Sequence, residues 1–396
     1  MNPDSVTSKL ESQILAKIIW SSLNELPEDV SGFELSESAG FTSNIHRLEV
    51  TWKTKNLSLP KTFVLKVRRS ENEDTRTTFE RELHATECSV YDYFMKNVNN
   101  SLVEIPKVYG TNLWPPTISD VVTLNINCSS NDGIDWLLME NLTSTRSASV
   151  QNVGRGLNFE QCSSVAKFLA RFHAKCASYT NWTQQFTVLD SNTAKFIVDV
   201  SEDCSRKCSK LFPEFWTFDN DALFSTLLTL ENFLCCNHDS TEMLQQVIVH
   251  GDFWCNNLLF TACQSESQTE PNQLAAVIDW QLTHCGSCMA DLSRFMFTSV
   301  PTNIRRNHRN DLIAIYLQEL KDHTPKANIN NLPTLQQLAT EYNRVAVFGA
   351  TLVPVQLYFQ TQVRDMNLTP DRLREFLRRH VECMEDLFEM KEVACE

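Results

Sequence analysis

The chain has 396 residues, which is long enough for two lobes that each bury a hydrophobic core. Its 42% apolar and 21% charged residues are ordinary for a soluble globular protein. The 35 basic and 49 acidic residues give a formal net charge of −14, and such an acidic surface repels phosphate backbones, so we expect no nucleic-acid partner.

Residues 1–140 are predicted to form a small β-rich lobe that binds a nucleotide. Strands are predicted at 41–52, 62–67 and 136–140, where β-branched and aromatic residues alternate or cluster. A helix is predicted at 77–96, where apolar residues recur near helical spacing.

Residues 141–396 are predicted to form a larger, mostly helical lobe for catalysis and acceptor binding. Asn158 followed by Gln161 has the pattern of a capping box at the start of a helix. The apolar run 345–359 predicts a buried core helix, and Thr-Pro-Asp at 369–371 predicts the start of the last helix. The expected fold class is therefore α+β with two lobes, and the crossing between them is expected near residues 139–144.

Targeting signals and common nucleotide fingerprints are missing from the sequence. The first 17 residues lack the apolar core of a signal peptide, and no run reaches the roughly 18 apolar residues that span a bilayer. We therefore expect a cytoplasmic protein with no membrane span, whose 14 cysteines are reduced thiols. The positions of the nine glycines match neither a Walker A loop nor a GxGxxG motif, so the two commonest nucleotide-binding fingerprints are absent from the sequence.

The stretch 247–260, VIVHGDFWCNNLLF, carries the main chemical signal. It places Asp252, and five residues later Asn257, between two apolar runs, and the run 274–278 leads directly into Asp279. Phosphoryl transfer needs a carboxylate to accept the acceptor's hydroxyl proton and oxygen ligands to hold Mg²⁺ at the nucleotide phosphates, and protein kinases use Asp, Asn and Asp in this order. Asp252 is the candidate base, and Asn257 and Asp279 are the candidate magnesium ligands.

A kinase also needs a strand lysine for the α and β phosphates and a helical glutamate to orient that lysine. Lys66 lies in the apolar run FVLKV at 63–67, an unusual place for a lysine that has no task. In the following helix, Glu87 shares its face with apolar residues and is the first candidate partner. Glu80 is the second candidate, and Glu82 is expected to face water.

The remaining nucleotide contacts are predicted from two short segments. Residues 38–44 are small and polar, and the backbone N–H groups around Gly40 and Ser43 are expected to cover the phosphates. The strand that ends at Glu140, together with the residues after it such as Leu142, is expected to bind adenine through backbone atoms. ATP and Mg²⁺ are therefore the expected cofactors.

Two other polar residues near the motif are assigned supporting roles. His250 lies beside Asp252, but its ring is expected to form hydrogen bonds with the loop backbone. Asp291 is expected to cap a helix or to tie down the catalytic loop, and not to bind metal.

The motifs resemble the ecdysteroid kinase-like family, within the choline kinase and aminoglycoside phosphotransferase superfamily. The resemblance is carried by HGDFWCNNLLF at 250–260 and IDWQLTHCGSCMADLSRF at 278–295. Gln281 favours this branch, because choline and aminoglycoside kinases usually have glutamate there. FVLKV, HATECSVYDYF and WLLMENL fit as well, so the resemblance covers roughly residues 30–390.

The resemblance implies a protein-kinase-like fold and ATP-dependent phosphorylation of a hydroxyl on a small molecule. The acceptors suggested for the family are ecdysteroids and hydroxylated or glycosylated foreign compounds. By the same match, Asp252 is the base, Asn257 and Asp279 are magnesium ligands, and Lys66 clamps the phosphates. The apolar run 345–359 indicates a lipophilic acceptor, such as a sterol, unless that run is core.

Two other functions fit part of the pattern. A catalytically inactive kinase-like binding protein would hold a ligand without transfer, although no key residue is missing. A metal-dependent hydrolase would use His250, Asp252 and Asp279 as ligands, but it would leave Lys66 and Glu87 without a role. A protein substrate is disfavoured, because no clear activation segment follows Asp279.

Overall fold

The computed structural model of the protein divides into two units. The first combines residues 1–96 and 106–147, and the second combines residues 97–105 and 148–396. The structure describes residues 12–35, 43–54, 58–68, 75–98, 102, 104–113, 135–146, 148–150, 155–177, 182–238, 246–261, 273–362 and 369–394.

The first unit is built on a five-stranded antiparallel sheet with the strand order β1-β2-β3-β5-β4. Its strands are β1 (Pro27–Glu34), β2 (Ser43–Trp52), β3 (Thr62–Arg68), β4 (Val108–Asn112) and β5 (Trp136–Glu140). Its helices are α1 (Ser12–Leu23), α2 (Thr75–Tyr93) and α4 (Leu142–Arg146). The π-helical turn η1 (Phe94–Val98) directly follows α2.

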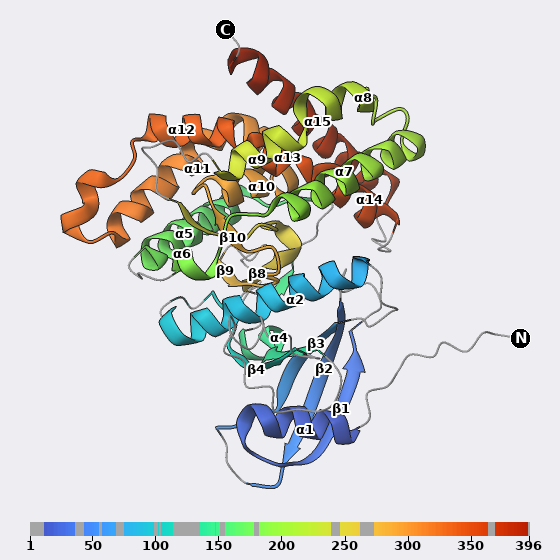
Figure 1. The fold of residues 1–396 in the computed structure, drawn as a ribbon, viewed down its shortest axis with the longest axis vertical. Helices are drawn as coiled ribbons and strands as arrows, with labels where there is room; N and C mark the ends of the chain where they lie inside the picture. The colour runs from blue at the N-terminus through green and yellow to red at the C-terminus, as the bar shows by residue number, and fades with distance from the viewer. Residues whose placement is uncertain are drawn as a thin grey trace, which may run out of the picture. The chain divides into compact units, whose positions relative to one another are not determined.

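The helices α1 and α2 both pack on this sheet (Figure 1). Leu15, Ile18 and Ile19 of α1 join a buried core with apolar side chains of β1, β2, β3 and β5, including Leu65. Successive side chains of a strand point to opposite faces, so Lys66 points away from that core. The sheet thus has an apolar face under α1 and a face under α2 that carries a charged residue.

The second unit is mostly helical. Its helices are α5 (Phe159–Cys176), α6 (Trp182–Gln185), α7 (Ser191–Leu211), α8 (Asn220–Ala222), α9 (Leu230–His238), α10 (Ala290–Ser299), α11 (Thr302–His323), α12 (Leu335–Arg344), α13 (Ala346–Thr351), α14 (Val353–Gln362) and α15 (Pro370–Ala394). The π-helical turn η2 (Leu223–Leu227) and the 3₁₀ turns η3 (Cys255–Asn257) and η4 (Lys326–Asn331) complete them.

Five short strands of this unit form two small antiparallel sheets. The first is β6-β8-β9, and the second is β10-β7. The strands are β6 (Ala148–Val150), β7 (Val247–Val249), β8 (Leu258–Thr261), β9 (Leu274–Val277) and β10 (His284–Gly286). The candidate polar residues therefore lie at the ends of short strands in both sheets.

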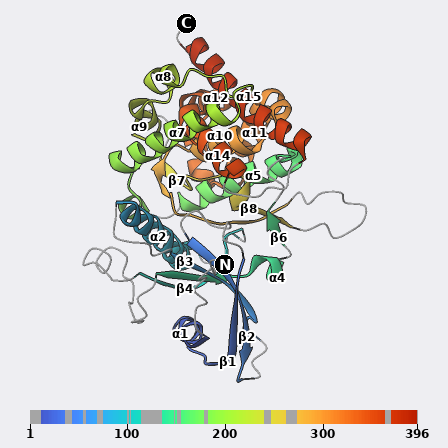
Figure 2. The same cartoon turned by 90° about the vertical axis from the view of Figure 1, so that its right-hand side faces the viewer.

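Helix α10 lies among the other helices of this unit (Figure 2). All ten of its residues are buried, including Asp291 and Arg294. A buried charged side chain needs a partner, because removal of an ion from water is costly. These two residues are therefore expected to hold other parts of the unit.

The predicted fold class, α+β with a β-rich first part and a mostly helical remainder, is confirmed by these two units. The strand at 136–140 and the capping box at Asn158 are also confirmed, because the Asn158 and Gln161 side chains exchange hydrogen bonds with each other's backbone N–H. No described helix has the length and apolar character required to cross a bilayer. The domain boundary at residue 140 stays a prediction.

The prediction of one helix over 345–359 is wrong. The run forms two helices, α13 and α14, which meet at Leu352. Pro354 explains the break, because proline has no N–H to donate and is tolerated only in the first turn of a helix. Every residue of α13 is buried, as the core assignment requires.

Candidate active site

Lys66 and Glu87 form a buried ion pair in the first unit. Lys66 lies on β3, opposite Ile45 of β2 and Leu137 of β5, and Glu87 lies on α2. The Lys66 Nζ is 2.6 Å from Glu87 Oε2, and the two residues are 7% and 1% exposed. A buried pair of this kind holds both side chains in place, because loss of either leaves an uncompensated charge.

Three of the other residues predicted to contact the nucleotide, Ser43, Glu140 and Leu142, lie in or beside the same sheet. Ser43 begins β2 and is buried, Leu142 begins α4 and is buried, and Gly40 lies outside the described residues. The Glu140 carboxylate accepts hydrogen bonds from Arg146 and Thr145. Burial would raise the pKa of Glu140, but these bonds outweigh it and lower the pKa. Because Thr145 and Arg146 occupy the Glu140 side chain, adenine is expected to contact the backbone atoms of this residue. That contact stays a prediction.

In the second unit, the Asp291 carboxylate of α10 holds the loop that follows β7. Its two oxygens accept the backbone N–H groups of His250 at 2.8 Å and Gly251 at 3.0 Å. Burial raises the pKa of Asp291 to about 7, although the two hydrogen bonds act in the opposite direction. The prediction that Asp291 ties down the loop that carries Asp252 is confirmed.

Gly251 allows the two segments that carry Asp252 and Asp279 to approach closely. Its φ is 87°, and a Cβ atom there would lie 2.2 Å from the carbonyl oxygen of Leu282. Only glycine adopts this conformation without steric cost, and no side chain fits in the space. Leu282 is three residues after Asp279, so the glycine brings the backbone of one candidate segment against that of the other.

The side chain of Asp252 is held on both carboxylate oxygens. Oδ2 accepts hydrogen bonds from Trp254 Nε1 and Asn257 Nδ2, each at 3.2 Å. Oδ1 accepts one from Arg294 Nη2 at 3.1 Å. The carboxylate is 18% exposed, so it is fixed in orientation while part of its surface still meets solvent.

Arg294 is the residue of this site that the sequence reasoning missed. It lies on α10, one turn after Asp291, and its side chain is 3% exposed. The available signal was an arginine directly before the apolar residues FMF at 295–297. A strong cation in such a run is rare unless it is paired, but the sequence does not reveal that the partner is Asp252.

Asp279 follows β9 in a strained backbone conformation. Its φ is 67°, a left-handed value that non-glycine residues rarely adopt and that concentrates at functional sites. Next to it, Ile278 donates its N–H to the Asn257 carbonyl at 3.0 Å. This bond connects the two candidate magnesium ligands through the backbone.

His250 is scaffolding, as predicted. Its Nε2 donates to the Ile278 carbonyl at 2.9 Å, and its Nδ1 accepts the N–H of Asp252 at 3.2 Å. This pattern requires a neutral ring, and burial lowers the pKa of His250 although Asp252 and Asp279 both raise it. Because both ring nitrogens are engaged within the loop, His250 is not available as a metal ligand.

The donor set of this site fits a magnesium ion. Asn257 donates its amide nitrogen to Asp252, so its amide oxygen and the Asp279 carboxylate are the hard oxygen ligands that Mg²⁺ prefers. Within the described ranges, no three His, Cys, Asp or Glu residues gather as a complete protein-made metal site would require. Magnesium commonly takes one or two protein ligands, with waters and substrate phosphates as the others.

Comparison with known proteins gives one family and one curated relative. A model of the ecdysteroid kinase-like family matches residues 37–329. A Caenorhabditis elegans protein named uncharacterized oxidoreductase dhs-27 is 30% identical over 111 residues, which are 28% of this chain and 14% of that protein. Most of that protein therefore lies outside the matched region. The oxidoreductase activity in its name belongs to that protein and is not assigned to this chain.

Solved structures resemble the chain at low sequence identity. A mutant of aminoglycoside 2′-phosphotransferase-IIIa in complex with GDP has 15% identity and a TM-score of 0.48, over 96% of this chain and 99% of that chain. Amicoumacin kinase with AMP-PNP and Ca²⁺ has 11% identity and a TM-score of 0.47, over 97% and 96%. Plasmodium vivax ethanolamine kinase has 10% identity and a TM-score of 0.45, over 89% and 82%.

Proposed function

The chain belongs to the ecdysteroid kinase-like family, and we propose that it is an ATP- and magnesium-dependent phosphotransferase acting on a hydroxyl of a small molecule. The observation that carries this proposal is the environment of Asp252. Its carboxylate is oriented by Arg294 and by Asn257, the candidate magnesium ligand five residues later. A positioned, partly exposed carboxylate is what a general base for a hydroxyl requires.

Each candidate residue has one role in the proposed reaction. Asp252 accepts the hydroxyl proton as the acceptor oxygen bonds to the γ-phosphorus of ATP and ADP departs. Lys66, held by Glu87, binds the α and β phosphates, and Asn257 and Asp279 hold the metal. Magnesium would neutralise charge that develops on the phosphate oxygens.

The acceptor is proposed to be a small molecule, and its lipophilic character stays a prediction. The apolar run that suggested it forms buried helix α13 and the start of α14, packed with α10. We also propose that the protein works in the cytoplasm. Ten cysteines in the described ranges are free thiols, which suits a reducing compartment.

A screen for ADP release tests the proposed activity. The protein is incubated with Mg·ATP and panels of steroids, glycosides and amino alcohols, and ADP is measured. Asp252→Asn should lower kcat by roughly 10²–10⁴-fold and leave ATP affinity nearly unchanged, because only the proton acceptor is lost. Full activity of Asp252→Asn with an accepted substrate would show that the base is misassigned.

Asp279→Asn should act on nucleotide binding instead. Loss of one carboxylate from the metal site removes a charged ligand, so the affinity for Mg·ATP should fall by about tenfold or more. Titration of ATP with and without Mg²⁺ separates this effect from loss of folding, because metal-free ATP binding should change little. Equal Mg·ATP affinity in both proteins would exclude Asp279 as a metal ligand.

A further inference from the structure

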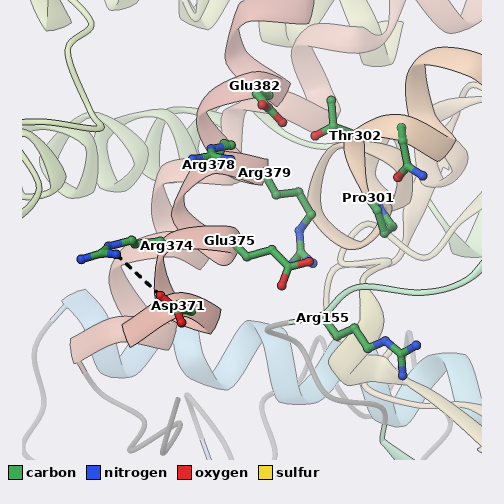
Figure 3. A pocket seen from close by; sticks show the side chains of 10 residues that line it. Arg155, Pro301, Thr302, Asp371, Arg374, Glu375, Arg378, Arg379 and Glu382 are labelled. Atoms are coloured by element: carbon green, nitrogen blue, oxygen red, sulfur yellow. Dashed lines mark ion pairs between the residues drawn. The ribbon is translucent and has the colours of Figure 1, made fainter. Parts of the chain in front are cut away.

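A cavity of about 440 Å³ lies in the second unit, and none of the residues assigned a role above lines it (Figure 3). It is bordered by α15, by the start of α11 and by the segment that contains Arg155. Four arginines line it, namely Arg155, Arg374, Arg378 and Arg379, and we call it the arginine pocket. Figure 3 shows Arg379 extending from α15 towards the side of the pocket that holds Pro301.

The acidic residues of the pocket are largely engaged by arginines. Glu375 accepts a hydrogen bond from Arg372 at 3.0 Å, and Arg372 does not line the pocket. Asp371 lies 3.6 Å from Arg374. Glu382 is the third carboxylate, so the lining carries four guanidinium groups and three carboxylates. The formal net charge of the lining is therefore positive.

Arg379 brings a buried positive charge to the wall of the pocket. It is 5% exposed, and burial lowers its pKa because its charged form is removed from water. Gly156, with a φ of 76°, lies against it, and a Cβ atom there would be 2.6 Å from Arg379 Nη1 and 3.0 Å from Pro301 Cγ. The chain thus has a glycine where any side chain would displace this guanidinium.

The N-terminus of α11 points into the same place. This helix has 22 residues, and its N-cap residue, Pro301, supplies no side-chain hydrogen bond. Thr302, the first helical residue, has a buried hydroxyl that makes no hydrogen bond within the described ranges. A helix N-terminus attracts anions through its unpaired N–H groups and its dipole, and an orphan hydroxyl adds a donor.

We propose that the arginine pocket binds the oxyanion of a small molecule, either inorganic phosphate or a phosphate monoester. Guanidinium groups bind such oxyanions through paired hydrogen bonds, and the helix N-terminus and the Thr302 hydroxyl contribute further donors. The pocket is separate from the residues proposed to bind ATP, so this inference does not depend on transferase activity.

The pocket is close to the turn that carries Asn257. Ser299, two residues before Pro301, accepts the N–H of Cys255 at 2.9 Å and, through its carbonyl, the N–H of Leu157 at 3.1 Å. Arg379 also acts electrostatically on Cys255. An anion in the pocket would therefore bind close to Ser299, the residue whose hydroxyl holds the backbone of the η3 turn.

Calorimetric titration of the full chain with inorganic phosphate, without nucleotide and at constant ionic strength, tests the proposal. Saturable binding is expected. Arg378→Glu should weaken it by about tenfold or more, because a guanidinium that can donate two hydrogen bonds to the anion is replaced by a carboxylate that repels it. Lys321→Glu makes the same charge change on an exposed residue of α11 outside the pocket, and it should leave the affinity within about twofold.

Thr302→Val tests the site without the risk that unfolding causes the fall in phosphate affinity. The hydroxyl makes no hydrogen bond with any residue that the structure describes, so valine should leave the urea midpoint unchanged or raise it. Phosphate affinity should nevertheless fall, and Thr302→Ser should retain it. If affinity is equal in Thr302→Val and the wild type, the hydroxyl plays no part and the proposed site is wrong.

Two further titrations identify the source of the anion and the location of binding. Tighter binding of glycerol 3-phosphate than of inorganic phosphate would support a phosphate monoester as the ligand, and equal binding would support phosphate itself; glycerol should not bind. Lys66→Ala should not change phosphate affinity. Loss of binding in Lys66→Ala, or no saturable binding of either anion to the wild type, would overturn the proposal.

Discussion

Arg294 is the charged residue that holds the carboxylate of the candidate base, Asp252. Its Nη2 donates to Asp252 Oδ1, while its Nε and Nη1 make no hydrogen bond among the described residues. Burial lowers the pKa of Arg294, and the charge of Asp252 opposes that change. A buried guanidinium with one strong partner is costly for stability, which favours a role in orienting the Asp252 carboxylate.

Arg294→Met should therefore separate activity from stability. We expect kcat to fall by about 10- to 100-fold, because the carboxylate loses the donor that fixes its orientation, while KM for ATP stays nearly constant. The urea midpoint should change little, because the Asp252 carboxylate keeps its hydrogen bonds from Trp254 and Asn257 and part of its surface meets solvent, so its charge is not left uncompensated.

Arg294→Lys is the matched control for charge. Lysine keeps a positive charge and one donor near Asp252, so kcat of Arg294→Lys should lie between the values of Arg294→Met and the wild type. If Arg294→Met retains the wild-type kcat, Asp252 does not need this donor and the positioning role is excluded.

At the scale of elements, the loop that carries the candidate base depends on a few backbone contacts between short strands. Asp291 on α10 binds the backbone of the loop after β7, and Gly251 lets that loop touch the segment after β9. The sheets β10-β7 and β6-β8-β9 have strands of three or four residues, too short to fix this geometry by pairing alone. The loop geometry therefore depends on side-chain anchors and on one glycine.

Gly251→Ala should damage this arrangement. The Cβ atom would meet the Leu282 carbonyl, so the loop must shift, and we expect about 1–3 kcal/mol less free energy of unfolding together with lower kcat. Urea denaturation and ADP release measure the two effects.

Gly286→Ala is a control in the paired strand β10. A Cβ atom there would lie 3.1 Å from the side-chain atom Val249 Cγ2, with no backbone atom among its nearest neighbours. Its effect should be clearly smaller. Equal effects of the two substitutions would indicate that general crowding, and not the Leu282 carbonyl, is the cause.

For the whole molecule, buried ionisable groups set the dependence of stability on pH. Burial lowers the pKa of His84 to about 4, of His173 to about 3 and of His284 to about 4, against an ordinary value of 6.5. The unfolded chain therefore takes up protons below pH 6.5 that the folded chain refuses. Asp291 acts in the opposite sense, because its folded pKa of about 7 exceeds its ordinary 3.8.

The urea midpoint should fall as the pH is lowered from 7 to 5. These three histidines favour unfolding in this range, each by on the order of 1–2 kcal/mol. His46, His250 and His380, whose pKa burial also lowers, act in the same direction, and Asp291 opposes them. In Asp291→Asn the fall should be steeper, because the opposing contribution is gone. A midpoint that does not change with pH, or the same slope in both proteins, would contradict these assignments.

Local patterns predicted much of the secondary structure. The capping box at Asn158 and the strand at 136–140 depend on residues close in the chain, so the sequence contains the whole cause. The run 345–359 was harder, because its apolar residues predict burial but do not locate the break at Leu352. Apolar periodicity reports which residues are buried, and proline geometry decides where a helix restarts.

By itself, the sequence determined the chemical types in the candidate site and their order along the chain. Lys66, Glu87, Asp252, Asn257 and Asp279 could be chosen because spacing and residue type limit what a phosphotransferase can use. Only the tertiary structure decided their partners: it pairs Lys66 with Glu87, directs Arg294 to Asp252, and places both nitrogens of the His250 ring in hydrogen bonds. The physical reason is that hydrogen bonds and ion pairs depend on distances of about 3 Å between atoms far apart in the chain, which only the packing of the elements sets.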